Sequence, residues 1–223
     1  MQSKILMVDK KVLVVEGRSE VFVIPYLMEA NGVAWGKGKN TVVNIKDYDG
    51  YSNIVQTDEI ATILQDSNLT ALGIIIDADE TPFDRWQSIR NACHKSMPDL
   101  PIEMPENGLI CDVTNVNNDK VKFGIWMMPD NKESGMLETF LAYMIPNETE
   151  MLWQFAQSSV EEATNQGANF TEFQRDKANI YTWLAWQNPP GRQLHQAVME
   201  KILDPTHPNA QKFVTWFKEL YGL

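Results

Sequence analysis

The chain has 223 residues, 43% of them hydrophobic, and its 30 acidic against 19 basic residues give a formal net charge of −11. This length fits one large domain or one domain with a helical extension, and the apolar content can support a core. The negative net charge argues against the general electrostatic binding of nucleic acid that basic proteins use, and a bound cation or a local basic patch could reverse this locally.

The cysteines and the apolar runs indicate the cellular compartment in which the protein is found. Cys93 and Cys111 have neither metal-site spacing nor the density of a disulfide scaffold, which favours a reducing environment. The first eleven residues lack the apolar stretch of a secretion signal, and no run reaches the length that spans a membrane. We therefore expect a soluble cytoplasmic protein that does not contact a membrane; no pattern in the sequence indicates its oligomeric state.

The first part of the chain alternates short β-branched runs with segments of helical periodicity, the pattern of a parallel α/β sheet flanked by helices. About four strands are expected, with helices between them. Strands are predicted at residues 11–15, 41–45, 71–76 and 121–128, and helices at 19–30, 51–65, 82–94 and 135–145. Pro25 is expected to kink the first helix or to mark its start, and Asn31-Gly32 to end it. Residues 97–120 contain three prolines and are predicted to be a loop with a short strand at 109–113.

After residue 146 the β-branched runs stop and the chain is predicted to be helical and rich in tryptophan. Helices are expected at 148–162, 171–187, 192–203 and 209–220. The predicted organisation is an α/β domain over residues 1–146 and a helical region, 147–223, packed on it.

Two acidic motifs follow apolar runs of this predicted sheet. Glu16-Gly17 follows residues 12–15, and Asp77-Ala78-Asp79 follows residues 72–76. Ligand sites of open parallel sheets form outside the carboxyl ends of the strands, where side chains converge. Asp77 and Asp79 reach the same side only if the backbone turns between them. Carboxylates at strand ends are typical ligands of a hard cation, so a Mg²⁺ or Mn²⁺ site is expected here.

The order of these motifs resembles a known family. A strand, Glu-Gly and a helix, followed by a strand and Asp-x-Asp, is similar to the Toprim domain of topoisomerases, primases and overcoming-lysogenization-defect (OLD) nucleases, over about residues 10–145. A closer resemblance, over nearly the whole chain, is to an uncharacterised Toprim-like family known as domain of unknown function 3226. The segments that carry it are 14–17 (VVEG), 73–79 (GIIIDAD), 126–131 (WMMPDN) with 135–138 (GMLE), and 183–187 (WLAWQ) with Pro190-Gly191.

The Toprim resemblance implies Mg²⁺-dependent phosphodiester chemistry on DNA or RNA. It implies Glu16 as a general acid/base or metal ligand and Asp77 and Asp79 as ligands. In OLD-type nucleases a second acid follows the glutamate by one helical turn, and Glu20 takes that place here where aspartate is commoner. The candidates for a second metal are Asp130, after the fourth strand, and Glu138, in the following helix. The resemblance also makes a protein partner, such as a helper ATPase, an open expectation.

Each acid also has a structural alternative. Glu16 could cap the following helix. The aspartates after the third and fourth strands could be turn residues. Glu20 and Glu138 could be solvated helical positions.

Besides the nuclease, two other functions stay open, a phosphatase as the second alternative and a non-catalytic module as the third. Residues 74–81 fit the haloacid-dehalogenase phosphatase pattern Asp-x-Asp-x-Thr, with Asp77 as nucleophile and Asp79 as acid/base. That motif normally opens its fold, whereas two strand–helix units precede it here, and a later Gly-Asp-x-x-x-Asp is missing. The third alternative is a non-catalytic Toprim-like module that binds Mg²⁺, a phosphate-bearing ligand or a partner, since fold does not determine function.

Overall fold

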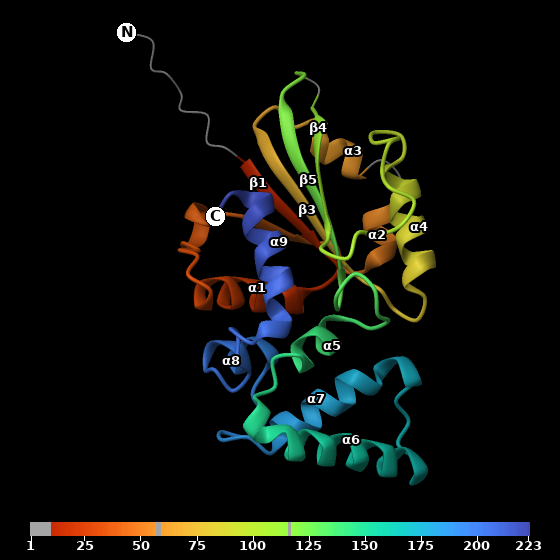
Figure 1. The fold of residues 1–223 in the computed structure, drawn as a ribbon, viewed down its shortest axis with the longest axis vertical. Coiled ribbons are helices and arrows are strands. Elements are labelled where there is room, and N and C mark those ends of the chain that lie inside the picture. The colour runs from red at the N-terminus through yellow and green to blue at the C-terminus, as the bar shows by residue number, and fades with distance from the viewer. Residues whose placement is uncertain (1–9, 57–58, 116) are drawn as a thin grey trace.

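The computed structural model describes residues 10–56, 59–115 and 117–223 (Figure 1). Its sheet follows the order β2-β1-β3-β5-β4, in which only β4 runs antiparallel to its neighbour. The expected α/β class with a mostly parallel sheet is therefore confirmed, and the short strand predicted within the long loop is the edge strand β4. The strands are β1 (Lys10–Val15), β2 (Asn44–Asp47), β3 (Leu69–Asp77), β4 (Leu109–Thr114) and β5 (Lys120–Met128).

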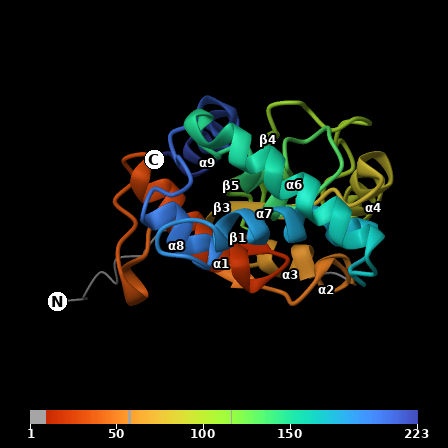
Figure 2. The same ribbon diagram turned by 90° about the horizontal axis from the view of Figure 1, so that it is seen from below.

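Helices cover both faces of the sheet and its carboxyl edge (Figures 1 and 2). The α-helices are α1 (Arg18–Ala30), α2 (Tyr51–Val55), α3 (Glu59–Leu64), α4 (Pro82–Cys93), α5 (Leu137–Ala142), α6 (Glu150–Asn165), α7 (Arg175–Ala185), α8 (Leu194–Met199) and α9 (Gln211–Tyr221). Short 3₁₀ helices are η1 (Gly38–Asn40), η2 (Asn147–Thr149), η3 (Glu172–Gln174) and η4 (Pro208–Ala210). None of the described helices is long and apolar enough to cross a membrane.

Several predicted boundaries differ from the structure. The single helix predicted over 51–65 is two short helices, α2 and α3; residues 57–58 lie outside the described part of the chain. The second strand begins at Asn44 rather than at residue 41, because the amide of Val42 donates to the carbonyl of Trp35 (2.9 Å) instead of joining the ladder. The alternative that the first helix begins at Pro25 is wrong, since α1 begins at Arg18 and includes this proline.

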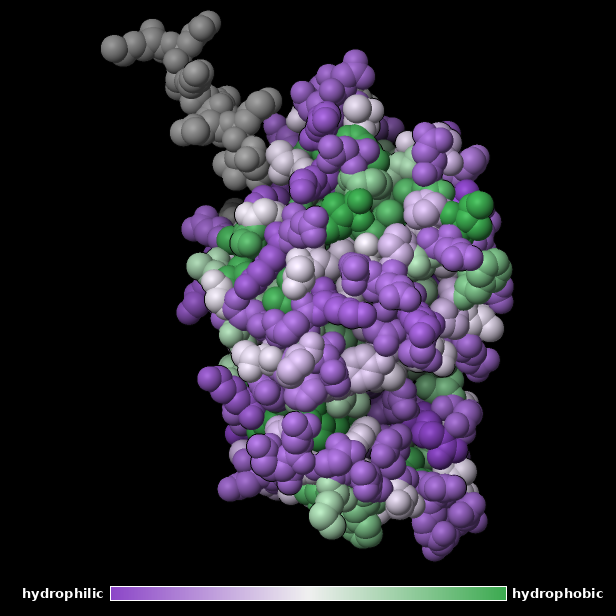
Figure 3. Space-filling view, viewed as in Figure 1, coloured by the Kyte–Doolittle hydropathy of each residue, from purple (hydrophilic) through white to green (hydrophobic). Residues whose placement is uncertain are grey.

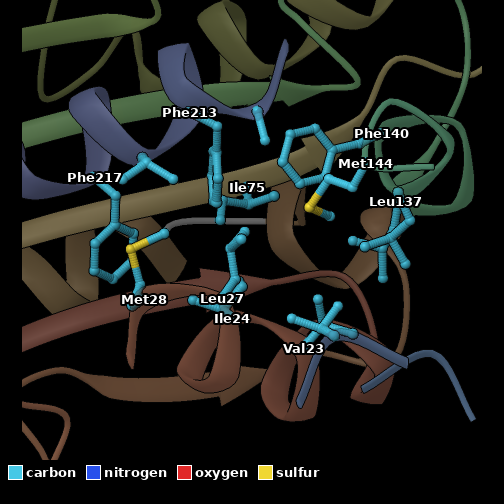
Figure 4. Close-up of a cluster of buried hydrophobic side chains, with 14 of the residues drawn as sticks. Val23, Ile24, Leu27, Met28, Ile75, Leu137, Phe140, Met144, Phe213 and Phe217 are labelled. Atoms are coloured by element: carbon cyan, nitrogen blue, oxygen red, sulfur yellow. The ribbon is translucent and has the colours of Figure 1, made fainter. Parts of the chain in front are cut away.

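Alternating side chains of the strands point into two separate cores. Leu13 and Val15 of β1 pack with α1, α5, α8 and α9, and Figure 4 shows part of this cluster. Val12 and Val14 pack on the opposite face with α2, α3 and α4. Both faces of the central strands are therefore buried, which explains why these strands are nearly continuous apolar runs.

The last helix, α9, lies close against the sheet because two glycines face it. Gly73 of β3 and Gly124 of β5 are paired directly across the sheet. A Cβ atom at Gly73 would overlap the hydroxyl of Tyr221, and one at Gly124 would lie 2.8 Å from Cδ2 of Leu220. The buried Tyr221 hydroxyl donates to the carbonyl of Val12 (2.8 Å), so the end of the chain is tied to the first strand.

The pair α6–α7 lies beyond α5, below the carboxyl ends of β1, β3 and β5 in the view of Figure 1. Helix α7 contacts both α5 and α6, and α8 contacts α1. The face of the molecule seen in Figure 3 is mainly hydrophilic, with small separate apolar areas. This arrangement brings the start of α7 to the edge of the sheet where the acidic motifs end.

Candidate functional site

The predicted acids after β1 and β3 meet at the carboxyl edge of the sheet. Glu16 follows β1 directly and Asp77 ends β3, its parallel neighbour. An oxygen of Glu16 accepts a hydrogen bond from the backbone amide of Asp77 (2.9 Å). The carboxylate of Asp77 accepts one from the amide of Leu137 (3.0 Å), the first residue of α5. These two bonds hold the start of α5 against the strand ends and so bring Glu138 to the same edge.

A cleft of about 360 Å³ opens at this edge. Four of the predicted residues line it: Glu16, Glu20, Asp77 and Glu138. Glu20, on α1, and Glu138, on α5, are 5% and 4% exposed, so the alternative that they are solvated helical positions is wrong.

Sequence reasoning missed the three further charged or aromatic residues that line the cleft: Asp49, Phe173 and Lys177. Asp49 has a detectable signal, since Asp47-Tyr48-Asp49-Gly50 puts acids at the end of β2, as the other two motifs do at the ends of β1 and β3. Phe173, in η3, and Lys177, on α7, have no such signal, because they belong to the helical region more than thirty residues beyond the last strand.

Burial and mutual repulsion dominate the electrostatics of the cleft. Burial, and then the carboxylates of Glu16, Glu20 and Glu138, raise the pKa of Asp77 well above its usual range. Burial, followed by the charges of Glu138, Glu16 and Asp47, raises the pKa of Glu20 to about 7. Burial and repulsion thus keep protons on Glu20 and Asp77, because the ionised cleft would hold more negative charge than its surroundings neutralise; a bound cation would favour the ionised forms.

Two basic residues offset part of this charge. The ammonium of Lys177 lies 3.1 Å from a carboxylate oxygen of Glu138. Burial raises the pKa of Glu16, while the hydrogen bond from Asp77 and the charge of Arg85 act against that rise. Among the described residues, no basic side chain pairs with Glu20.

Asp79 turns away from the cleft. Its backbone adopts a left-handed conformation (φ 54°) and exchanges two hydrogen bonds with Gly135, at 3.0 and 2.9 Å. Its carboxylate forms an ion pair with Arg85, whose guanidinium lies 3.7 Å from the centre of the Tyr51 ring. The backbone turn expected between Asp77 and Asp79 is present, but it places Asp79 at two neighbouring hollows, one lined also by Arg85 and the other also by Gly135 and Arg175.

Asp130 belongs to a turn after β5. Its carboxylate accepts the amides of Lys132 (3.2 Å) and Glu133 (2.9 Å) and the hydroxyl of Tyr143 (3.0 Å). Asp130 is therefore a turn residue, as the structural alternative predicted. It is not among the residues that line the cleft.

The donor set of the cleft fits a hard divalent cation. Carboxylate oxygens are the ligands that Mg²⁺ prefers, and it commonly uses few of them while keeping waters. In the described part of the chain, no three His, Cys, Asp or Glu side chains are already arranged to hold a metal ion. Binding would therefore need the carboxylates that line the cleft to move closer together.

The fold and the cleft define an α/β protein with an open, mostly parallel sheet whose carboxyl edge carries converging carboxylates. The chain belongs to the family described as "Protein of unknown function (DUF3226)", whose model matches residues 10–222. This match confirms the closer of the two resemblances found in the sequence. No curated protein and no solved structure matches the chain.

Proposed function

We propose that this protein is a Mg²⁺- or Mn²⁺-dependent nuclease, or a related phosphotransfer enzyme, of Toprim type that acts on DNA or RNA in the cytoplasm. The observation that carries the proposal is the convergence of Glu16, Glu20, Asp77 and Glu138 from separate elements on one cleft. The order of the motifs, Glu-Gly after one strand and Asp-x-Asp after its parallel neighbour, supports the Toprim assignment.

The four carboxylates have different roles in this proposal. A bound divalent cation would neutralise phosphate charge and lower the pKa of a water molecule. Asp77, Glu20 and Glu138 would hold the cation. Glu16 suits a general acid/base, because burial raises the pKa of its carboxyl toward the range in which proton transfer at neutral pH is efficient. Asp79 joins the ligands only if it leaves Arg85, which would at the same time free a cation for phosphate.

A non-catalytic module is the second candidate, favoured by one observation. The ion pair of Lys177 with Glu138 places a permanent positive charge inside the cleft. Such a charge can bind a phosphate-bearing ligand or a partner without turnover. The phosphatase alternative needs Asp77 and Asp79 to act on one substrate, and their carboxylates face different hollows.

Calorimetric titration of Mg²⁺ and Mn²⁺ tests the proposal at its first step. The wild type is expected to bind at micromolar to millimolar metal, and the Asp77→Asn/Asp79→Asn double variant to lose binding. The control is Glu162→Gln, which removes an acid from the exposed face of α6 and is expected to bind as the wild type does. Unchanged binding by the double variant, or absent binding by the wild type at millimolar metal, would overturn the metal site.

Cleavage assays then distinguish the enzyme from the module. Metal-dependent cleavage of DNA or RNA that disappears in Asp77→Asn and persists in Glu162→Gln supports the nuclease. Metal binding without cleavage of any polynucleotide or phosphate ester points to the module. Cleavage that is equal in the wild type and Asp77→Asn would contradict a role for the cleft.

A further inference from the structure

Three exposed apolar side chains lie together on the outer helix pair. Helix α6 is the outermost element at this end of the molecule (Figures 1 and 2). Met151 and Phe155 of α6 are 85% and 61% exposed, and Trp186, directly after α7, is 41% exposed. Met151 and Phe155 are four residues apart and so share one face of α6, while the rings of Phe155 and Trp186 stack with centroids 5.3 Å apart. We call these three residues the α6 patch.

The α6 patch is held by the core beneath it. Leu152 and Trp153, on the inner side of α6, pack against the larger hydrophobic core. The amide of Trp186 donates to the carbonyl of the fully buried Trp183 (3.1 Å). Side chains that are already positioned lose little conformational entropy when a partner covers them. Adjacent exposed apolar residues of this kind, rimmed by polar ones, are typical of protein interaction sites.

The surface around the α6 patch is acidic. Residues 146–174 contain five acids and no Lys, Arg or His; the acids are Glu148, Glu150, Glu161, Glu162 and Glu172. Glu150 directly precedes Met151, and Glu162 lies about two turns beyond Phe155 on the same face of α6. The α6 patch therefore has exposed carboxylates at both of its ends along the helix.

The basic side chains that come next in the chain do not offset these acids. Arg175 donates two hydrogen bonds of 2.6 Å to Glu172. Glu172 first, and then the charges of Glu161 and Asp176, raise the pKa of Arg175, so several acids share this one cation. Lys177 and Arg192 are paired with acids outside α6. Among the described residues, the four acids of η2 and α6 form no ion pair with a basic side chain.

We propose that the α6 patch is the docking surface for a basic segment of a protein partner. Apolar side chains of that segment cover Met151, Phe155 and Trp186, and its Lys or Arg side chains meet the carboxylates at the rim. Aromatic and Met side chains are enriched at the centre of protein interfaces, and complementary charge around them speeds association and selects the partner. The three residues line none of the hollows at the carboxyl edge, so the inference does not depend on the proposed function.

The charge of the surface argues against three other occupants. A second copy of the chain would bring its own rim carboxylates, and a net charge of −11, against those of the first. Like charges that face each other across an interface cost several kcal/mol. Membrane surfaces rich in anionic lipid attract basic segments, and nucleic acid binds through its phosphates, so both are repelled by an acidic rim.

The test is fluorescence anisotropy with a labelled amphipathic peptide of Leu and Lys whose leucines occupy one helical face. The wild type is expected to bind this peptide, and to bind it less tightly as salt is raised. Phe155→Ala is expected to weaken binding about tenfold, as loss of an aromatic residue at the centre of an interface does. Met151→Ser, at the most exposed of the three positions, is a second variant that leaves the core untouched, and a several-fold loss is expected.

Matched controls separate this surface from general attraction to an acidic protein. Phe83→Ala removes a similarly exposed ring (64%) from α4 and is expected to leave binding unchanged. Glu161→Gln/Glu162→Gln is expected to weaken binding several-fold. Glu103→Gln/Glu106→Gln makes the same change of charge at exposed positions before β4 and is expected to have little effect. A peptide of equal composition with scattered leucines is expected to bind less tightly than the amphipathic one.

Several results would overturn the inference. These are a wild type that does not bind the amphipathic peptide or binds the scattered one equally well, equal affinity of Phe155→Ala and the wild type, and an equal loss in Phe83→Ala. Sedimentation velocity and anionic phosphatidylserine vesicles test the other occupants. A dimer, or vesicle binding, that Phe155→Ala abolishes would assign the α6 patch to a second copy or to a membrane and refute the basic protein partner.

Discussion

The buried carboxyl of Glu20 makes a quantitative prediction about stability and pH. Its pKa is raised from an ordinary value of 4.5 to about 7 by burial first and then by the charges of Glu138, Glu16 and Asp47. The folded protein therefore binds more protons than the unfolded chain between those two pH values. The free energy of unfolding must fall as pH rises through this window and level off above it.

The size of the stability change follows from the size of the pKa shift of Glu20. Each pH unit changes the free energy of unfolding by about 1.4 kcal/mol, so Glu20 alone contributes a loss of about 3 kcal/mol between pH 4.5 and 7. Glu20→Gln cannot ionise, and it keeps nearly the same shape. The variant is expected to be more stable than the wild type above pH 7, by up to about 3 kcal/mol, and to match it near pH 4.5.

Urea denaturation followed by tryptophan fluorescence, at intervals from pH 4.5 to 8, measures both curves. Asp77 changes stability in the same direction, because its pKa is also raised, so the wild-type curve is expected to fall further than Glu20 alone requires. The difference between the two proteins reports Glu20 together with its effect on Asp77, whose pKa the charge of Glu20 raises. A wild type that gains stability between pH 5 and 7, or a Glu20→Gln variant that is no more stable than the wild type at pH 8, would refute the reasoning.

Two further predictions follow from the packing and from the charge in the cleft. Gly124→Ala is expected to lower the free energy of unfolding by about 1–3 kcal/mol, because its Cβ would lie 2.8 Å from Leu220. In urea denaturation the cost should shrink in a Leu220→Ala background; an equal cost in both backgrounds would contradict the close approach. Lys177→Met removes the cation beside Glu138 and is expected to tighten Mg²⁺ binding in calorimetry several-fold, since the cleft loses a competing positive charge. Weaker binding by this variant would show that Lys177 supports the site.

The sequence predicted the parts of the fold that depend on local patterns. The apolar run of β3 is buried on both faces, and its nearly continuous apolarity alone indicates a central strand. Gly32, in the left-handed conformation (φ 87°), ends α1 as Asn31-Gly32 predicted. Glu16 and Asp77 meet because carboxyl ends of parallel neighbours share one edge of a sheet.

Only the tertiary structure decided where the remaining side chains of the site point. Asp79 and Asp77 are two residues apart, yet the left-handed turn and the ion pair with Arg85 direct Asp79 to another hollow. Lys177 and Phe173 reach the cleft only because α7 packs on α5. These outcomes depend on contacts between segments far apart in the chain, and local residue patterns carry no information about which distant surfaces meet. The sequence by itself therefore determined the strands and the acids that end them, whereas the packing of the helices decided which charges and which aromatic ring surround the cleft.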